Sequence, residues 1–369
     1  MATGSITLAF FGDVMTGRGV DQILPHPGDP VLRESYIKDA GGYVRLAELE
    51  SGPIRRPVDF DWPWGDVLDV LAATAPDARV MNLETAVTRC ADFAPDKVVH
   101  YRMNPANVPC LTAARPDAVV VANNHVLDFG RDGLAETLDT LAGAGLRTAG
   151  AGPDEAAAER PAEVPIPGGR LLVFAFGTTS SGIPPAWAAG PDRPGVYLMP
   201  ERPDAAAAAA ARMRAAARPG DIVVASVHWG SNWGYEVPGE RVAMAHALVD
   251  GGVDVVFGHS SHHPRPVEVY RDRLVMYGCG DFIDDYEGIS GYEEYRDDLR
   301  LLYLVSLEPD GRLAGLRMVP FRSRQMRNRL APDEDVAWLR GLLNRVGREF
   351  GTRVDGGPDG MLTLRTGRD

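Results

Sequence analysis

Residues 6–15 of the chain read Ile-Thr-Leu-Ala-Phe-Phe-Gly-Asp-Val-Met, a short apolar run that ends in a glycine and an aspartate. A nearly continuous apolar run of this length is typical of a strand buried on both faces of a sheet. We predict further strands of this kind at residues 79–83, 117–122, 170–176, 221–227 and 253–257. Helical spacing or helix-forming composition predicts helices at residues 130–144, 204–218, 240–249 and 333–350.

The order of these elements indicates the fold class. Strands alternate with helices as far as residue 257, and two hairpins follow at residues 267–277 and 300–320. This order is typical of an α/β protein in which helices cover mixed sheets, and we expect a two-sheet sandwich. We expect one domain at residues 1–330, with an excursion loop at 25–65 and a rim loop at 281–298. A C-terminal helix and tail at 331–369 should pack on this domain. The stretch 281–298 has a second interpretation, a subunit contact in a homo-oligomer.

Composition narrows the class of protein. The 369 residues carry a formal net charge of -13, and 45% of them are hydrophobic, which is ordinary for a globular chain. An acidic chain repels phosphate backbones, so we expect no nucleic-acid partner, although a local basic pocket can still accept an anionic substrate. The 3 cysteines form no CxxC pair. No apolar run spans a bilayer and no secretory signal opens the chain, so we expect a cytoplasmic protein without a membrane span.

Polar side chains of metal-ligand type follow the predicted strands. Each taken alone has a plain structural explanation, such as a turn residue, a cap, an ion pair or a core histidine. Together they are more informative, because ligands of α/β sheets bind beyond the carboxyl ends of the strands. Of the 8 histidines in the chain, His125, His228, His259 and His262 all fall at this edge. The candidate metal ligands are Asp13, Glu84, Asn124, His228, His259 and His262.

This mixture of side chains restricts the metal. Imidazole, carboxylate and amide oxygen together suit Zn, Mn or Fe and differ from an all-oxygen calcium site. We expect one or two divalent ions. Two ions would be bridged by a carboxylate, for which Glu84 is the natural candidate. A single ion with an open position is also compatible with these residues.

Arg18 is the best candidate for a cationic group that holds a carboxylate or phosphate of the substrate, since it lies five residues after Asp13. We therefore include Arg18 among the candidate catalytic residues. Asp13, which is also a candidate metal ligand, is included with it. The alternative for Arg18 is a solvated surface charge.

The order of these motifs resembles the capsule-synthesis CapA/PgsA family, which is linked to poly-γ-glutamate biosynthesis and is similar in fold to calcineurin-like metallophosphoesterases. The resemblance spans residues 5–325 and rests on ordered motifs. These are Gly12-Asp13-Val14-Met15, Asn82-Leu83-Glu84, Asn123-Asn124-His125, His228-Trp229-Gly230, Gly258-His259 with His262, and Tyr277-Gly278-Cys279-Gly280-Asp281-Phe282, an altered form of a Ser-Leu-Gly-Asn-Phe motif. The resemblance implies a four-layer αββα sandwich with mixed sheets.

The resemblance also implies roles for individual residues. Asp13 matches the first metal aspartate, and Glu84 takes the place of the bridging carboxylate. His125 matches the histidine that protonates a leaving group or holds the transition-state oxyanion. The chain departs from the phosphoesterase pattern at Met15, which stands where the Asp-x-His motif has its histidine.

The leading hypothesis is a metal-dependent hydrolase. A metal-activated water would attack a phosphoester or a γ-glutamyl amide or ester of an anionic small-molecule, peptide or polyglutamate substrate, with His125 assisting as an acid. The alternative is a non-catalytic accessory protein of poly-γ-glutamate capsule biosynthesis that binds an anionic polymer. The missing histidine at Met15 motivates this alternative. A third hypothesis is a biosynthetic enzyme that forms or cleaves an amide on a small metabolite.

Overall fold

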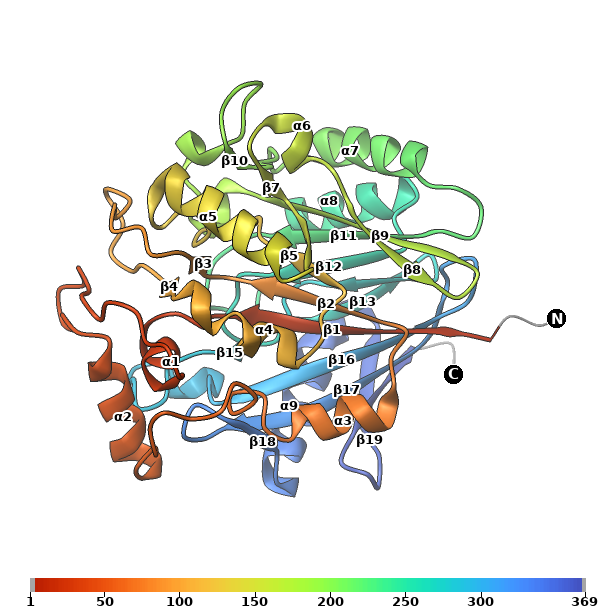
Figure 1. The fold of residues 1–369 in the computed structure, drawn as a ribbon. Coiled ribbons are helices and arrows are strands. Elements are labelled where there is room, and N and C mark those ends of the chain that lie inside the picture. The colour runs from red at the N-terminus through yellow and green to blue at the C-terminus, as the bar shows by residue number, and fades with distance from the viewer. Residues whose placement is uncertain (1–3, 367–369) are drawn as a thin grey trace.

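The computed structural model describes residues 4–366 and shows two β-sheets packed face to face, with helices on both outer faces (Figure 1). This arrangement is the two-sheet α/β sandwich that the order of the elements predicts, in the four-layer αββα form that the family resemblance implies. The predicted strands and helices are all present, with their ends shifted by a few residues.

The first sheet has ten strands, in the order β19-β20-β17-β16-β1-β2-β5-β6, with β15 pairing with β1 and β18 with β17. Strands β15, β2, β5 and β6 run parallel to β1, whereas β16 is antiparallel to it. The sheet is therefore mixed. Its strands are β1 (Ile6–Val14), β2 (Ala78–Leu83), β5 (Ala118–Val120), β6 (Arg147–Ala149), β15 (Asp281–Ile283), β16 (Leu299–Leu307), β17 (Leu313–Ser323), β18 (Asn328–Leu330), β19 (Thr352–Gly356) and β20 (Leu362–Thr366).

The second sheet has six strands in the order β13-β14-β12-β11-β9-β8. Its four central strands are parallel, and the edge strands β13 and β8 are antiparallel to their neighbours. The strands are β8 (Ala162–Ile166), β9 (Gly169–Gly177), β11 (Ile222–His228), β12 (Val255–His259), β13 (Val267–Tyr270) and β14 (Arg273–Met276). Two short pairs lie apart from these sheets, β3 (Ala86–Val87) with β4 (Arg102–Met103) and β7 (Ala151–Gly152) with β10 (Gly195–Val196).

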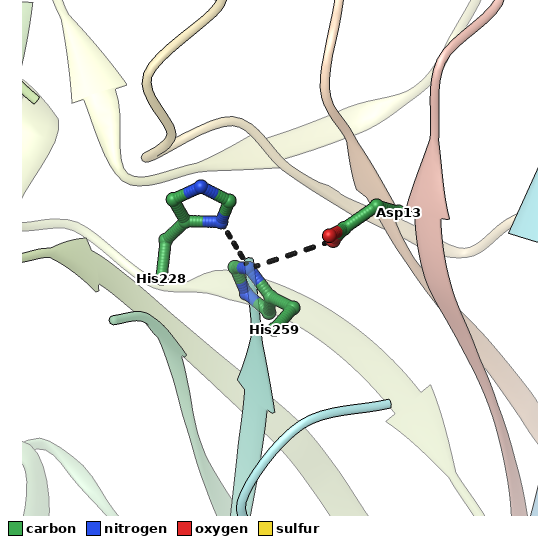
Figure 2. A group of neighbouring side chains, drawn as sticks. All are labelled: Asp13, His228 and His259. Carbon is green, nitrogen blue, oxygen red and sulfur yellow. Dashed lines mark hydrogen bonds and ion pairs between the residues drawn. The ribbon is translucent and has the colours of Figure 1, made fainter. Parts of the chain in front are cut away.

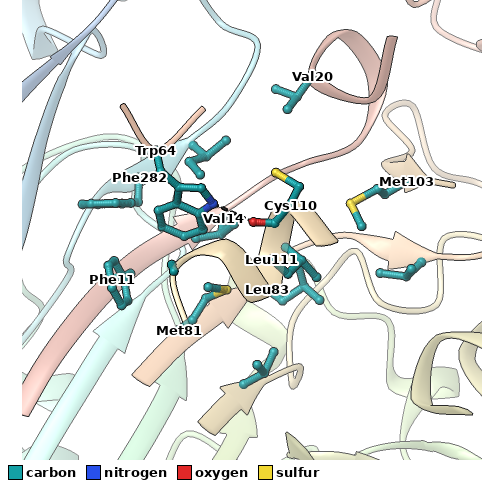
Figure 3. Packing of buried hydrophobic residues seen from close by; sticks show 14 of the residues in the cluster. Phe11, Val14, Val20, Trp64, Met81, Leu83, Met103, Cys110, Leu111 and Phe282 are labelled. Carbon is teal, nitrogen blue, oxygen red and sulfur yellow. Dashed lines mark hydrogen bonds between the residues drawn. The ribbon is translucent and has the colours of Figure 1, made fainter. Parts of the chain in front are cut away.

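Helices cover the outer face of each sheet. Residues of α1 to α5 join the outward side chains of the first sheet in one hydrophobic cluster, part of which is shown in Figure 3. Residues of α7 and α8 do the same on the second sheet. The helices are α1 (Arg18–Ile23), α2 (Gly41–Ser51), α3 (Val67–Thr74), α4 (Pro109–Ala113), α5 (Gly130–Gly143), α6 (Glu155–Ala158), α7 (Pro203–Ala216), α8 (Gly239–Asp250) and α9 (Asp333–Val346).

Strand β1 shows how the sequence builds these layers. Side chains alternate across a strand, so that Leu8 and Phe10 point into the core between the sheets while Ala9 and Phe11 point toward the helices. Phe10 meets Phe257 of the second sheet with ring centroids 5.0 Å apart. Because β1 is apolar on both faces, it is buried on both faces and forms the centre of the first sheet.

Several connecting segments carry more regular structure than we expected. The excursion loop 25–65 contains α2, and residues 150–169, which we expected to be a loop, contain β7, α6 and β8. Strand β8 includes Pro165, which is tolerated because β8 lies at the edge of its sheet. The first three residues of the expected rim loop form β15 beside β1. The tail at 331–369 contributes β19 and β20 to the first sheet. Within residues 4–366, no helix is both long and apolar enough to cross a bilayer.

Candidate metal centre

The carboxyl ends of parallel strands from both sheets meet at one place, as the sequence predicts. Asp13 lies near the end of β1, Glu84 directly follows β2, and Asn124 lies in the loop after β5. His228 and His259 are the last residues of β11 and β12. Figure 2 shows Asp13, His228 and His259 facing one another across the junction of the two sheets.

His228 and His259 are partners in the parallel register of β11 and β12. Their Nδ1 atoms lie 2.7 Å apart, and both rings are buried. The Nε2 atom of His259 lies 2.8 Å from the Ser226 hydroxyl, and the Nε2 atom of His228 lies 2.9 Å from the amide oxygen of Asn124. Burial lowers the pKa of His259 to about 3 and, together with the nearby His259, lowers the pKa of His228 well below its usual value. Both imidazoles are therefore neutral at pH 7, as a metal ligand requires.

Asp13 and Glu84 bring buried carboxylates to the same place. Asp13 accepts hydrogen bonds from the side chain of Asn82 at 2.6 Å and from the amide of Ser260 at 3.1 Å, and its Oδ1 lies 3.9 Å from His259 Nδ1. The Oε1 atom of Glu84 lies 3.8 Å from His228 Nε2. Burial raises the pKa of Asp13 to about 7, and burial followed by the charge of Asp13 raises the pKa of Glu84. A cation between these groups would offset the cost of burying their charges.

His125 is held by two residues outside the ligand set. Its Nδ1 lies 2.6 Å from Asp128 Oδ2 and 3.1 Å from Lys97 Nζ, and Lys97 forms an ion pair with Asp128. Burial lowers the pKa of His125 to about 4, so the ring is neutral at pH 7. Its Nε2 lies 3.9 Å from Glu84 Oε1 and faces the centre. We did not expect Lys97, because it comes from the irregular segment between β3 and β4, where the sequence has no periodic pattern.

His262 lies beside Asp281, another residue that we did not include among the candidate ligands. His262 Nδ1 is 2.9 Å from Asp281 Oδ1, and both side chains are buried. Burial would lower the pKa of His262, but Asp281 and Asp13 outweigh it and raise that pKa above its usual value. The signal for Asp281 was present in the sequence, since it occupies the asparagine position of the altered motif at 277–282.

Two groups of side chains have a geometry that could hold a metal ion. One consists of Asp13, His228 and His259, the other of Asp13, His262 and Asp281, and within each group the ligand atoms lie within 4.8 Å of one another. Glu84 Oε2 and Asp281 Oδ2 are buried and have no hydrogen-bond partner in the part of the chain that the structure describes. Such orphaned carboxylate oxygens fit a bound cation, since buried polar atoms otherwise find a partner. The nitrogen and oxygen donors also fit Zn, Mn or Fe.

Arg18 takes a different position from the one expected of a substrate-binding group. Its buried guanidinium donates to Glu34 and Tyr43, each at 2.9 Å, and forms an ion pair with Asp285. The guanidinium also lies over the ring of Tyr101, with Cζ 4.5 Å from the ring centroid. Tyr101 in turn packs edge-on against His125, with ring centroids 4.5 Å apart. Arg18 is therefore separated from His125 by the ring of Tyr101, and its charge is matched by the carboxylates of Glu34 and Asp285. Binding of substrate by Arg18 stays a prediction.

The chain is similar to capsule-synthesis proteins over most of its length. The family model described as "Bacterial capsule synthesis protein PGA_cap" matches residues 7–286. A Mycobacterium tuberculosis protein named "Probable polyglutamine synthesis accessory protein" is 53% identical over 363 residues, which are 97% of this chain and 96% of the relative. The "PGA biosynthesis protein CapA" of Bacillus subtilis is 24% identical over 90% of this chain and 80% of its own. The crystal structure of TT1561 from Thermus thermophilus aligns with 84% of this chain and 97% of its own at 12% identity, with a TM-score of 0.38.

Proposed function

Because this chain belongs to the bacterial capsule synthesis protein PGA_cap family, we propose that it is a divalent-metal-dependent hydrolase. Its substrate would be an anionic small molecule, peptide or polyglutamate that contains a γ-glutamyl amide or ester or a phosphoester bond. This proposal is supported by one observation. Neutral imidazoles meet buried carboxylates at the strand ends, and some of the carboxylate oxygens have no hydrogen-bond partner within residues 4–366. Such a set is costly to bury without a cation.

Asp13, His228 and His259 would hold the ion, with Glu84 and Asn124 beside them. A divalent cation in such a site acts as a Lewis acid and lowers the pKa of bound water. The second ring nitrogens of His228 and His259 are already engaged by Asn124 and Ser226. These contacts fix the orientation of both rings, which supports metal binding.

His125 is the residue that would move a proton. Asp128 accepts from its Nδ1, which leaves Nε2 as the atom that takes up or returns a proton on the side of the centre. Lys97 pairs with Asp128 on the Nδ1 side of the ring and neutralises its charge. An anionic substrate near Nε2 would favour the protonated ring and so help His125 to act as an acid.

The substrate class comes from the relatives. Their printed names refer to polyglutamine synthesis and PGA biosynthesis, so γ-glutamyl amides are the first substrates to test, followed by phosphoesters. Purified protein loaded with Mn²⁺ or Zn²⁺ should release product from one of these classes, lose the activity with a chelator and regain it when the ion is restored. His228→Ala should be inactive, whereas the matched variant His246→Ala, in which a histidine paired with Glu268 outside the centre is removed, should stay active.

A non-catalytic accessory role is the second candidate. Met15 is fully buried at the position where the phosphoesterase motif has a histidine, and its sulfur lies 3.8 Å from the Tyr286 hydroxyl. This thioether is a poor ligand for a hard cation. Binding of poly-γ-glutamate without turnover under Mn²⁺, Zn²⁺ or Fe²⁺ would favour the accessory role over the hydrolase.

A further inference from the structure

Two tyrosines of the segment that follows β15 pack against the His262 side of the centre. Tyr295 stacks on His263, with ring centroids 4.8 Å apart and ring planes 19° apart. Tyr292 stacks on Trp233 with centroids 4.1 Å apart and an angle of 8° between the ring planes. Trp233 in turn lies 5.2 Å from the ring of His262. His262 and His263 are only 6% and 1% exposed beneath this aromatic layer, which therefore separates them from solvent.

Residues 290–295, which carry both tyrosines and which we call the flap, are otherwise weakly attached to the molecule. All of them except Tyr295 are exposed. In the described part of the chain, each hydrogen bond of the flap has its partner inside residues 290–296. The chain is fixed on either side, because Ile289 packs against the hydrophobic cluster of the first sheet and Arg296 donates to Asp335 at 2.7 Å. The ring contacts of Tyr292 and Tyr295 are therefore the main attachment of the flap itself.

The flap also has room to move. A cavity of about 380 Å³ borders it, and Ser290 and Glu293 are among the residues that line this cavity. Neither Tyr292 nor Tyr295 lines the cavity, so it lies on the side of the flap away from the stacked rings. Gly291 has a φ of 105°, a conformation that glycine adopts without the steric cost of a side chain. The flap thus has free space on one side and a permissive residue near one end.

We propose that the flap opens and closes over the His262 side of the centre and that its stacked tyrosines hold it closed. Opening would admit substrate, because the candidate ligands Asp13, His228 and His259 are at most 1% exposed in this closed arrangement. The admission of substrate rests on the proposed function, whereas the opening itself depends only on the packing of the rings. The competing explanation is a fixed wall, with ligands entering only past Asn124, which is partly exposed.

The substitution Tyr292→Ala separates these explanations when the two covered histidines are used as reporters. Among residues 4–366, the ring of Tyr292 stacks only with Trp233. Its removal therefore uncovers His263 only if the flap as a whole opens more often. The matched controls are Tyr292→Phe, which keeps the stacked ring, and Tyr36→Ala, which removes a tyrosine that is 65% exposed elsewhere on the surface.

The experiment treats the metal-free full chain with diethyl pyrocarbonate, which acylates accessible neutral imidazoles, and follows each histidine by mass spectrometry. His246, whose side chain is 28% exposed, serves as the reference within each sample. The labelling rates of His262 and His263 are proportional to the population of the open flap, and one stacked pair of rings changes such a population by roughly 2- to 10-fold. Tyr292→Ala should therefore raise both rates by roughly this factor, whereas both controls should match the wild type.

Three results would overturn the proposal. Equal rates in Tyr292→Ala and the wild type would show a fixed wall. Equally fast labelling in Tyr292→Phe and Tyr292→Ala would show that ring stacking does not hold the flap. Faster labelling of His263 without His262 would show that the flap opens away from the centre. None of these results depends on a bound ion or on turnover, so a failure of the proposed metal centre would be seen separately, as a wild type that retains no metal.

Discussion

The Nδ1 atom of His228 lies 2.7 Å from the Nδ1 atom of His259 at the ends of adjacent parallel strands. Two neutral imidazoles at this distance share a single proton between the facing nitrogens, because one ring must donate and the other accept. Asp13 is the acidic neighbour of this pair, with Oδ1 3.9 Å from His259 Nδ1. His228, His259 and Asp13 are the residues that would hold a divalent ion here.

Asp128 should stabilise the fold as well as position His125. Its carboxylate is buried and paired with Lys97, whose side chain is only 14% exposed. Replacing Asp128 by Asn leaves the ammonium group without a counter-charge, so we expect a loss of about 3–5 kcal/mol in the free energy of unfolding. Urea denaturation of Asp128→Asn and of the double variant Lys97→Met/Asp128→Asn measures this loss. The double variant should recover part of the stability. Equal stability in Asp128→Asn and the wild type would show that the pair is unimportant.

The same carboxylate should give a defined pH dependence of stability. Burial would raise the pKa of Asp128, but His125 and Lys97 outweigh burial and hold the pKa below its usual value. The folded state therefore binds the proton more weakly than the unfolded state, in which the pKa is about 3.9. The stabilisation is complete above that value and is lost as the pH falls through the lower folded-state pKa. The stability difference between the wild type and Asp128→Asn, measured from pH 7 to pH 3, should shrink only at the acidic end. A difference that vanishes near pH 6 would contradict this assignment.

Arg18 should contribute to stability more than to substrate affinity. Its guanidinium is matched by Glu34 and Asp285, and all three side chains are buried. Arg18→Lys keeps the charge but loses the forked geometry, and we expect it to lower the free energy of unfolding by about 1–3 kcal/mol. Chemical denaturation together with steady-state kinetics tests this expectation. An increase in KM with unchanged stability would instead assign Arg18 to the substrate.

The C-terminal residues should fold as part of the same core as the strands of the first sheet. Leu343 of α9 and Leu364 of β20 belong to the hydrophobic cluster between the sheets. Leu343→Ala should therefore destabilise the whole protein by about 2–5 kcal/mol in a single cooperative transition. Leu330→Ala, at a side chain that is 54% exposed, should change stability by about 0.5 kcal/mol or less. Two separate unfolding transitions in calorimetry would indicate that residues 331–366 fold independently.

The central strands and the predicted ligands could be read from the sequence for one physical reason. A strand buried on both faces is almost entirely apolar, as β1, β11 and β12 are, and the first ionisable residue then lies at or near its carboxyl end. Because parallel strands end at one edge, Asp13, His228 and His259 could be expected to meet. The family resemblance, which the comparisons confirm, also rests on these strand ends.

Other features could not be predicted because they depend on contacts between distant segments. Strand β15 has three residues, too few for a periodic pattern, and is stabilised by its pairing with β1. Lys97 reaches His125 from an irregular loop, and the partners of Arg18 come from positions 34 and 285. An arginine near a motif is therefore weak evidence for substrate binding, since distant carboxylates can neutralise it in the fold.

Metal content measured by elemental analysis tests the central claim most directly. The purified full chain would be stripped with a chelator, reloaded with Mn²⁺ or Zn²⁺ and freed of excess ion, beside the double variant His228→Ala/His259→Ala and the control His246→Ala. We predict that the wild type and the control retain at least one ion per chain and that the double variant loses the ion that Asp13, His228 and His259 would hold while keeping its fold. Equal metal content in the double variant and the wild type, or a wild type that retains no ion, would contradict the proposed metal centre.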